Sequence, residues 1–550
     1  MTAPTLGTGI RARAIMARAA GPADPVHVAA GALFALVMVL PSLLSSVVLV
    51  DWTDSVERGV VGLAEGAVVA LWWLRPGGTL PVPSAWLRGG LAAVAAAMVL
   101  STIAAPHAAP AVVRTAEWGM HALFGAVVWA EAQSGTRFLG VWRRASLAGV
   151  AGVLGVALAL WVSLDVPDAY PWGASFPFLL GPRWLGTYGV LAVTLGTWGL
   201  IGKTATPTAT AAAMAWMSAG WTAVWWSGSR GAFGAALLGC VVVGVLAPRT
   251  VRVAICAALA SGIGALASVP LSMPRFGMGA GRLWTSAVAA PGASFDSGRS
   301  YLWTTTLDAW QTRPWLGLGP DGVIPHLMPL GSAHAHNTVI QALGEWGWVG
   351  GAPFLVFLAG VALAGSWRAW TTSDPFRIVA AGYLLAVLAN GMLEGVLYDP
   401  GTTLLVTAAA AIGIAPTVDP RHAGRPVWIA PAVAGLALVL LLHLVVLRAV
   451  WAPGAPSPES LRWRLVRAFP SAPVLVPVAQ WGHAWASARP ASALDLARWG
   501  ERQGRQPWLF YRLGADVHDR NGHTAAGLRA RRQADALQRS ALRTAPPWRK

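Results

Sequence analysis

Long apolar stretches separated by short polar connections fill most of the chain before residue 450. Blocks of about 17 to 25 apolar residues are long enough to cross a hydrocarbon core of about 30 Å as helices. The pattern therefore predicts an all-α polytopic membrane protein with about 12 to 13 transmembrane helices. The thirteen apolar segments are 26–50, 60–74, 87–105, 111–131, 145–164, 185–202, 208–226, 231–247, 251–270, 338–365, 376–397, 401–416 and 427–450.

The composition agrees with a membrane location. Of the 550 residues, 55% are hydrophobic and 11% are charged, whereas a soluble domain carries about 25% charged residues. The two cysteines, Cys240 and Cys256, lie inside apolar segments, so neither a disulfide framework nor a cysteine-rich metal site is expected. Arg11, Arg13 and Arg18 precede a long apolar run that has no convincing cleavage site, and we expect this run to be an uncleaved first span.

The distribution of lysine and arginine predicts which side of the membrane each connection occupies. With a cytoplasmic N-terminus, fifteen basic residues fall in cytoplasmic segments and eight in the opposite ones. Nine spans then precede the long loop, which is expected outside the cytoplasm. The predicted organisation is a cytoplasmic N-terminal segment at 1–25, spans 1–9 at 26–270, the long outer loop with candidate motifs at 271–337, spans 10–13 at 338–450, and a basic helical tail at 453–550.

The tail differs from the bundle in composition. From Pro453 onward it holds 16 basic and 6 acidic residues, a balance of +10 out of the net +17. A solvated helical tail and a surface for an anionic partner are both consistent with this charge. Residues 507–537 resemble one tetratricopeptide-type unit, with a less regular one at 478–500. Two units are fewer than such repeats need for independent stability, so we expect the tail to pack on something.

The location of the tail depends on the number of spans. Thirteen spans place the tail outside the cytoplasm, on the same side as the long loop. If one short segment does not cross the membrane, the tail lies in the cytoplasm instead.

Ionisable residues within apolar segments are candidates for function because a charge in hydrocarbon is costly. Glu65, Glu345, Glu394, His121 and His443 meet this description. Each lies within a turn or two of a predicted span end, where we expect water to reach it. They form no repeated pattern of charged pairs in mid-membrane, which weakens the hypothesis of a proton-coupled transporter.

Common nucleotide and metalloprotease motifs do not explain the chain. The stretch GLGPDG, with Gly317, Gly319 and Gly322, matches the dinucleotide pattern G-x-G-x-x-G, but it lies in a loop with no strand before it. Tight turns are the expected explanation. The sequence contains neither HExxH nor a Walker phosphate loop.

Two arginines stand at positions where they can face a ligand. Arg230, in SGSRGAFGAALL, lies between two spans, where it is either a snorkelling anchor or an anion ligand at a helix N-terminus. Arg299 precedes an amphipathic segment from Tyr301 to Trp310. A short helix at the membrane face would hold Arg299 over the bundle.

The stretch HAHN places two histidines and an asparagine before an apolar segment. Thr338 and Gln341 fit a capping box, which predicts that the helix begins at Thr338. His336 and Asn337 would then lie at the positive end of that helix. A metal site from His334 and His336 is conceivable but has no evident third ligand. Ordinary loop hydrogen bonds are the simpler explanation of the histidines in isolation.

In combination, these motifs resemble the O-antigen ligase family. His336 and Asn337, followed after nine residues by Gly347-x-x-Gly350, are similar to the H-[N/S/Q]-x9-G-x-x-G signature of bacterial O-antigen ligases. The same domain occurs in O-antigen polymerases and some protein O-oligosaccharyltransferases. The resemblance covers roughly 225–400, while the thirteenth span and the tail exceed the ligase pattern. Further matching elements are SGSRGAFGAALL, Gly-Arg299-x-x-x-Trp303 and Pro314-Trp-Leu-Gly317-Leu-Gly319.

The resemblance implies a multi-pass enzyme of the bacterial inner membrane whose active site faces the periplasm. Such enzymes transfer a glycan from an undecaprenyl-diphosphate carrier to an acceptor, commonly lipid A–core. Direct displacement of the diphosphate would invert the anomeric centre. Because the diphosphate leaves readily, neither a metal ion nor another cofactor is expected.

The resemblance also assigns roles to individual residues. Arg230 and Arg299 are expected to bind the diphosphate, since guanidinium groups bind phosphate oxygens in a bidentate manner. His336 is the expected base for the acceptor hydroxyl, or the group that orients it. Asn337 and His334 are expected to make further substrate contacts. Arg313 and Arg282 lie in the same loop, but no local pattern singles them out.

Alternatives within and outside this family stay open. A ligase, a polymerase and a protein O-oligosaccharyltransferase differ in acceptor, and the repeat-like tail mildly favours the last two. A transporter or flippase would require essential charges in mid-membrane and a symmetric repeat of spans. A scaffold that recruits a partner through its basic tail would leave the Arg299 and His336 motifs unexplained. Nucleic acid is not an expected partner.

Overall fold

The computed structural model describes residues 24–47, 54–76, 79–80, 82–134, 136–169, 183–201, 206–273, 278–281, 283, 299–327, 332–415, 426–451, 455–468, 475–502 and 507–543. Within these residues the chain is helical, and its extended structure is limited to one isolated bridge between Met273 and Met278.

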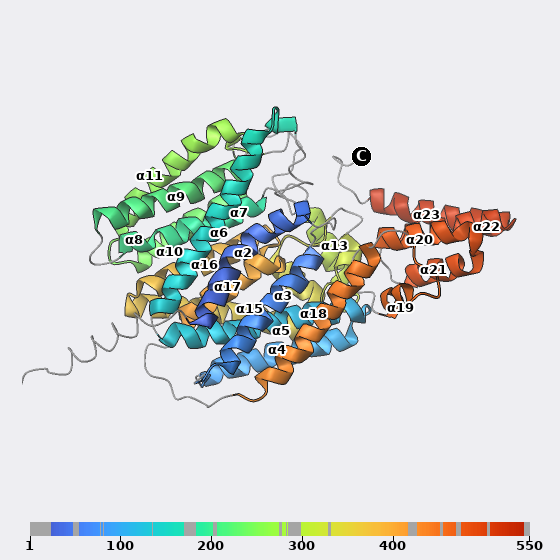
Figure 1. Cartoon of the computed structure of the whole chain (residues 1–550), viewed down its shortest axis with the longest axis horizontal. Helices are drawn as coiled ribbons and strands as arrows, with labels where there is room; N and C mark the ends of the chain where they lie inside the picture. Colours follow the sequence, from blue (N-terminus) through green and yellow to red (C-terminus); the bar gives the residue numbers. More distant parts are fainter. Residues whose placement is uncertain are drawn as a thin grey trace, which may run out of the picture.

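A helix lies at each of the thirteen apolar segments predicted from the sequence (Figure 1). They are α2 (Pro25–Val47), α3 (Asp54–Leu74), α4 (Ala85–Ala104), α5 (Ala108–Ser134), α6 (Thr136–Ser163), α7 (Arg183–Gly196) continued by α8 (Trp198–Ile201), α9 (Pro207–Ser227), α10 (Arg230–Leu246), α11 (Thr250–Ser268), α15 (Thr338–Thr372), α16 (Pro375–Asn390), α17 (Pro400–Ile414) and α18 (Ile429–Trp451).

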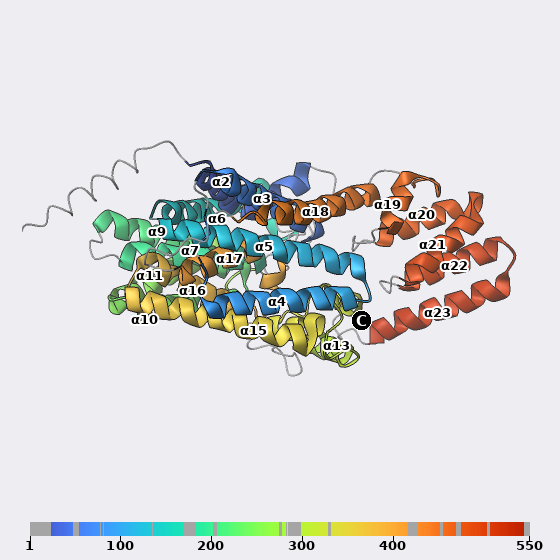
Figure 2. The same cartoon turned by 90° about the horizontal axis from the view of Figure 1, so that it is seen from below.

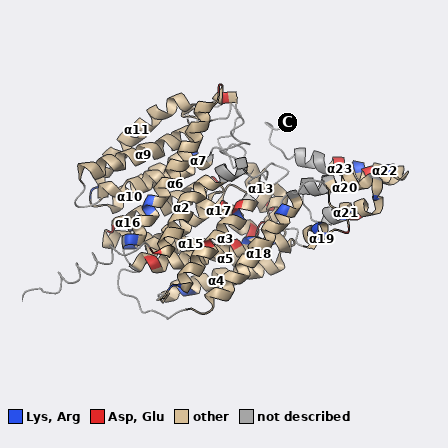
Figure 3. Cartoon of the chain, viewed as in Figure 1, with Lys and Arg blue, Asp and Glu red and all other residues tan. Residues whose placement is uncertain are grey.

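Length and apolar composition qualify six of the described helices as membrane spans. Four further apolar helices are shorter, including α10, α16 and α17. Figure 3 shows few Lys, Arg, Asp or Glu positions along the described helices of the bundle. The protein is therefore an all-α polytopic membrane protein, as the hydropathy pattern predicted. The six qualifying segments are Ala85–Ala104, Arg137–Ser163, Trp184–Ile201, Thr250–Leu271, Thr338–Thr372 and Ile429–Val450.

Small residues allow several helices to approach closely. A Cβ atom at Gly189 of α7 would lie 2.6 Å from the Gly220 carbonyl oxygen of α9, and one at Gly220 would lie 2.7 Å from the Val193 amide nitrogen. Such backbone-to-backbone contact is typical of membrane bundles, where association depends on packing more than on a hydrophobic driving force. These glycines therefore set the separation of α7 and α9.

The loop between α11 and α15 contributes two described helices, α13 (Arg299–Gln311) and α14 (Ile324–Leu327). The predicted short helix after Arg299 is confirmed, with Arg299 as its first residue. Both α13 and the start of α15 lie at the same end of the bundle (Figure 2). We call this the loop end of the bundle.

The tail consists of five described helices, arranged partly as helical hairpins. The α20–α21 and α22–α23 pairs agree with the predicted helix–turn–helix rhythm, while their relation to tetratricopeptide repeats stays a prediction. The tail projects from the loop end (Figures 1 and 2). The five helices are α19 (Leu461–Ala468), α20 (Leu475–Ala488), α21 (Pro490–Arg502), α22 (Pro507–Arg520) and α23 (Thr524–Arg543).

The tail packs on the bundle, as its size led us to expect. Trp463 and Trp485 share a buried apolar cluster with Val446, Leu447 and Val450 at the end of α18. The two indole rings meet edge to face, 5.6 Å apart. The last span thus supplies part of the hydrophobic core of the tail.

Candidate active site

The helix α15 begins at Thr338, as predicted, but its cap differs from the prediction. Asn337 is the capping residue, because its Oδ1 accepts hydrogen bonds from the amides of Val339 and Ile340 at 3.0 and 3.1 Å. Gln341 does not close a capping box with Thr338. Its Oε1 instead accepts from the Ala335 amide at 2.7 Å, which ties the helix back to the HAHN segment. The sequence pattern assigned the cap to Thr338 and not to Asn337, because asparagine and threonine are both favourable N-cap residues.

The HAHN segment docks on the connection between α16 and α17. The Thr338 amide donates to the Gly391 carbonyl at 2.7 Å, and Asn337 Nδ2 donates to the Met392 carbonyl at 3.1 Å. A Cβ atom at Gly395 would lie 3.1 Å from the His334 ring. Two segments distant in sequence are therefore held together by hydrogen bonds to main-chain carbonyls of the connection.

Glu394 of this connection contacts both Arg299 and His336. Its Oε1 lies 2.5 Å from Arg299 Nη2, and its Oε2 lies 3.2 Å from His336 Nδ1. The carboxylate is 7% exposed and His336 is partly buried. Two predicted site residues from different segments thus meet on a carboxylate that the sequence pattern had not paired with them.

His336 adopts an unusual backbone conformation for its residue type. Its φ is +52°, in the left-handed region that favours glycine and asparagine. Such conformations persist only where the surrounding contacts enforce them, and they cluster at functional sites. Here the docked neighbours Ala335 and Asn337 fix the backbone on either side.

Arg230 is the first residue of α10, and its neighbour Ser229 caps that helix. The predicted position at a helix N-terminus is confirmed. A Cβ atom at the adjacent Gly231 would lie 3.5 Å from Glu394 Cγ and 2.5 Å from Asn390 Oδ1. The start of α10 is therefore packed against the carboxylate that contacts Arg299 and His336, which brings all three predicted residues to one region.

Two other arginines of the long loop, Arg313 and Arg282, are not placed in the region of Arg230, Arg299 and His336. Arg313 Nη1 donates to the carbonyl of Ala104 at the end of α4, at 2.8 Å, so this side chain ties the loop to the bundle. Arg282 lies outside the described residues.

His334 lies beside the site. Its ring is 6.4 Å from that of His336 and 5.5 Å from that of Tyr398. Burial and the neighbouring carboxylate of Glu345 raise the pKa of Tyr398, so its hydroxyl remains protonated at neutral pH. That hydroxyl donates to Glu345 Oε2 at 3.2 Å. His334 is thereby next to a larger set of buried polar groups.

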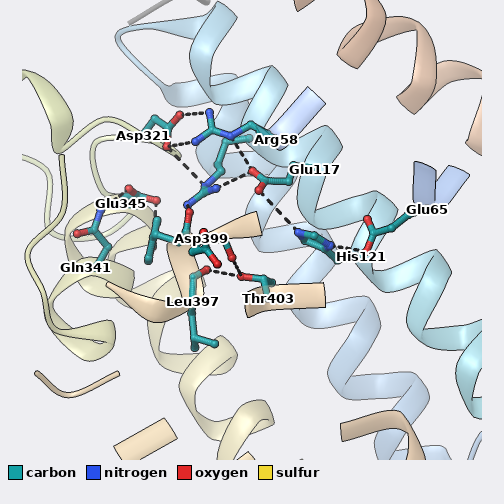
Figure 4. Close-up of polar contacts among 12 residues, drawn as sticks. Arg58, Glu65, Glu117, His121, Asp321, Gln341, Glu345, Leu397, Asp399 and Thr403 are labelled. Carbon is teal, nitrogen blue, oxygen red and sulfur yellow. Dashed lines mark hydrogen bonds and ion pairs between the residues drawn. The ribbon is translucent and has the colours of Figure 1, made fainter. Parts of the chain in front are cut away.

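This set is a network of charged side chains inside the bundle (Figure 4). Arg58 Nη1 lies 2.6 Å from Asp321 Oδ2, and Arg58 Nε lies 2.8 Å from Glu117 Oε2. Arg114 Nη1 approaches the same Glu117 oxygen at 2.6 Å. All four are at most 5% exposed. Helices α3 and α5 are thus joined to the long loop through ion pairs.

The network includes further buried groups. His121 Nδ1 lies 2.7 Å from Glu65 Oε1, and Gln341 Nε2 donates to Glu345 Oε1 at 2.7 Å. Glu65, His121 and Glu345 are at most 2% exposed. The expectation that water reaches these groups is therefore wrong. Their proximity to span ends did not expose them, because neighbouring helices and the loop cover them.

The glycine-rich loop lies against a break in α15. Gly347 has φ +61° and ψ −166°, outside helical values, and the neighbouring amides of Trp348 and Val349 donate to the Pro314 and Trp315 carbonyls at 2.9 Å. In return, the amide of Gly319 donates to the Glu345 carbonyl at 2.8 Å. The loop thus satisfies main-chain groups that the break leaves outside the helix.

The glycines of GLGPDG form tight turns, as expected. Gly317 and Gly319 have φ values of +69° and +83°. Asp321, between them and Gly322, also has a positive φ, and its carboxylate enters the buried network. The motif therefore serves to place Asp321 and to support the break at Gly347.

Among the described residues, one group has the composition and proximity to hold a metal ion. Ligand atoms of Asp24, His27 and Glu131 lie within 4.8 Å of one another at the end of the bundle opposite the loop. Arg75 already forms ion pairs with Asp24 and Glu131. The guanidinium of Arg75 thus already balances the negative charge of these carboxylates, and we assign no metal site here.

Sequence reasoning did not predict the partners of the candidate site residues. Glu394 was among the ionisable residues of apolar segments, and the cost of burying a carboxylate was the available signal. Arg58, Arg114 and Glu117 were not singled out, although each is a charge next to or within an apolar segment. The sequence did not indicate which of these charged side chains form ion pairs with one another.

Comparisons with known proteins agree with the motif assignment. Residues 212–355 match the family model described as O-antigen ligase, a segment that contains Arg230, Arg299 and His336 but not Glu394. A search of curated proteins found no match. The family implies glycan transfer in the biosynthesis of O-antigen or a related polysaccharide. Residues 212–355 are therefore similar to the O-antigen ligase family, as the motifs in this segment predicted.

Proposed function

We propose that this protein transfers a glycan from an undecaprenyl-diphosphate-linked donor to an acceptor hydroxyl at the periplasmic membrane face, as an O-antigen ligase that attaches polysaccharide to lipid A–core. The observation that carries the proposal is the meeting of Arg299 and His336 on Glu394, with the start of α10 beside them. A fixed cation and a titratable base within one cluster suit the displacement of a diphosphate by a hydroxyl.

The arginines would act on the leaving group. As the bond between sugar and phosphate breaks, negative charge grows on the bridging oxygen of the diphosphate. Arg299 and Arg230 would stabilise that charge through N–H donors that remain protonated throughout. Arg299 pairs with Glu394, so the donor diphosphate would replace or share this carboxylate as the partner of the guanidinium.

His336 would act on the acceptor. Its Nδ1 lies 3.2 Å from Glu394 Oε2. With the proton on Nδ1, directed toward this carboxylate, Nε2 would be left as the proton acceptor. As the acceptor oxygen attacks the anomeric carbon, Nε2 would take the hydroxyl proton. The imidazolium so formed would be stabilised by the Glu394 carboxylate. Glu394 would therefore position and support the base.

The stereochemistry and the remaining contacts follow from this scheme. A single displacement inverts the anomeric centre. Asn337, which holds the HAHN segment on the α16–α17 connection, would act mainly by positioning His336, while His334 is a candidate contact for sugar or phosphate. The scheme assigns no step to a metal ion.

A polymerase or a protein O-oligosaccharyltransferase would use the same chemistry with another acceptor. The tail favours these alternatives, because its helices stand at the loop end, where they could hold a glycan or protein chain (Figure 2). A transporter or flippase gains support from the buried Glu65–His121 pair. That hypothesis gives no account of the family match at 212–355.

The product of a strain that lacks the gene tests the proposal. For a ligase, lipid-linked glycan should accumulate and never appear on lipid A–core. Retention of single attached repeat units with loss of long chains would show a polymerase. Purified protein in vesicles should then transfer labelled glycan from its lipid carrier to lipid A–core. Unchanged glycans in the deletion strain, with no transfer by the purified protein, would refute glycan transfer altogether.

A further inference from the structure

A cavity of about 330 Å³ lies at the end of the bundle opposite the candidate active site. It is bounded by the first turns of α6 and α9 and by the α7–α8 junction, and its lining includes Arg143, Arg144, Trp198, Ala212 and Trp216. Helix α5 begins at the loop end, because Arg114 near its start forms an ion pair with Asp321 of the long loop. It then runs to the opposite end of the bundle, where α6 begins directly after it. The cavity is therefore on the side predicted to be cytoplasmic.

The described lining of this cavity carries two guanidinium groups and no carboxylate. Arg143 stacks on the indole of Trp198, with its guanidinium carbon 4.0 Å from the ring centroid. Within the described part of the chain, Arg143 Nε and Trp198 Nε1 are both buried without a hydrogen-bond partner. Buried N–H donors normally have hydrogen-bond acceptors, so acceptor oxygens of a ligand would satisfy these two groups.

Further positive charge surrounds the start of α9. Arg252 of α11 donates to the Thr210 hydroxyl, one residue from the lining residue Ala209. The α9 N-terminus, capped by Thr206, adds the positive end of a helix of 21 residues. An anion with several acceptor oxygens fits this environment better than a neutral ligand or a cation.

The position of the cavity indicates that its occupant is a lipid. Arg144 and Ala212 are exposed, so the cavity opens on the outer wall of the bundle. Farther along α6, Leu158 and Val162 are also exposed, on a helix long and apolar enough to span the membrane. A ligand whose phosphate lies between the arginines could therefore extend its acyl chains along α6.

We propose that this cavity binds the headgroup of an anionic phospholipid from the cytoplasmic leaflet, with its phosphate oxygens on Arg143, Arg144 and the Trp198 indole N–H. Basic pockets between transmembrane helices on the cytoplasmic side are suited to such headgroups. The bound lipid would hold α6 and α9 together at an end where few main-chain contacts join them. This site is independent of the Arg299–Glu394–His336 cluster and of the proposed glycan transfer.

Native mass spectrometry of the full-length protein, reconstituted with phosphatidylglycerol or phosphatidylcholine, tests this site. The wild type should retain phosphatidylglycerol preferentially. Arg143→Gln and Arg144→Gln should each weaken retention roughly fivefold, because each removes one charge near the headgroup. Arg88→Gln, at an exposed arginine near the start of α4, is the matched control and should retain the lipid as the wild type does.

A second variant keeps both arginines. Ala212→Trp places an indole at the exposed mouth of the cavity and should block retention without changing the charge. Equal retention of the two lipids, or undiminished phosphatidylglycerol in both arginine variants and in Ala212→Trp, would overturn the proposal. Binding of inorganic phosphate at this cavity with no retention of phosphatidylglycerol would also overturn it, since it would identify a site for the free ion.

Discussion

Glu394 and Arg299 are 95 positions apart in the chain, yet Glu394 Oε1 lies 2.5 Å from Arg299 Nη2. This contact joins the first residue of α13 to the connection between α16 and α17. Because the same carboxylate also faces His336, it links the long loop, the HAHN segment and the bundle at one point. A change at Glu394 should therefore affect both of the residues that the motifs identified.

Glu394→Gln should lower the rate of glycan transfer by roughly 10²-fold, because an amide cannot stabilise the imidazolium of His336. Transfer of labelled glycan by protein in vesicles measures this rate. The exposed Glu459 of the tail offers a control, and Glu459→Gln should leave the rate unchanged. If Glu394→Gln is correctly inserted and retains the wild-type rate, Glu394 has no part in the reaction.

His336→Asn should abolish transfer while the fold is preserved. Asparagine tolerates the left-handed backbone of this position better than alanine does, so a loss of activity reports on the imidazole and not on strain. Thermal unfolding of the purified variant, measured beside its transfer rate, separates the two causes. An active His336→Asn enzyme would refute the role of His336 as base.

Arg299→Lys should reduce transfer strongly even though the charge is kept. A lysine ammonium cannot bind two phosphate oxygens in the planar, bidentate manner of a guanidinium. The matched variant is Arg313→Lys in the same loop, since Arg313 contacts the Ala104 carbonyl and not the cluster. Similar transfer rates for the two variants would contradict a specific role for Arg299.

Asp321→Asn should destabilise the protein by about 3 to 5 kcal/mol, the usual cost of removing one partner from a buried ion pair. Asparagine tolerates the positive φ of Asp321, so the effect would come from the charge. Denaturant or thermal unfolding in detergent measures it. Asp308→Asn, at an exposed position of α13, is the control and should change little.

Gly347→Ala should prevent the loop from docking on α15. The new Cβ would lie 2.3 Å from the Trp315 carbonyl oxygen, and the backbone has a positive φ. We expect low yield of folded protein and no detectable transfer. Gly262→Ala in α11 meets open space and should behave as the wild type. Normal folding of Gly347→Ala would show that the break in α15 is dispensable.

Gly347 illustrates how much of the structure a local sequence pattern predicts. The glycine was part of a recognisable motif, but its use in a break of α15 became visible only with the Pro314–Gly319 segment packed beside it. In the same way, the start of α15 at Thr338 was predicted correctly while its cap was assigned to the wrong residue. Capping depends on side-chain orientation, which several residue types can satisfy.

The sequence by itself determined the helical membrane bundle, because an apolar run of spanning length can bury its backbone polar groups only as a helix. Its motifs also predicted Arg230, Arg299 and His336 as site residues. The tertiary structure decided that Glu394 joins Arg299 to His336, and that Asp321 enters a buried network with Arg58 across 263 positions. Charges that pair over such separations leave no periodic signal, because their geometry arises only when distant helices pack.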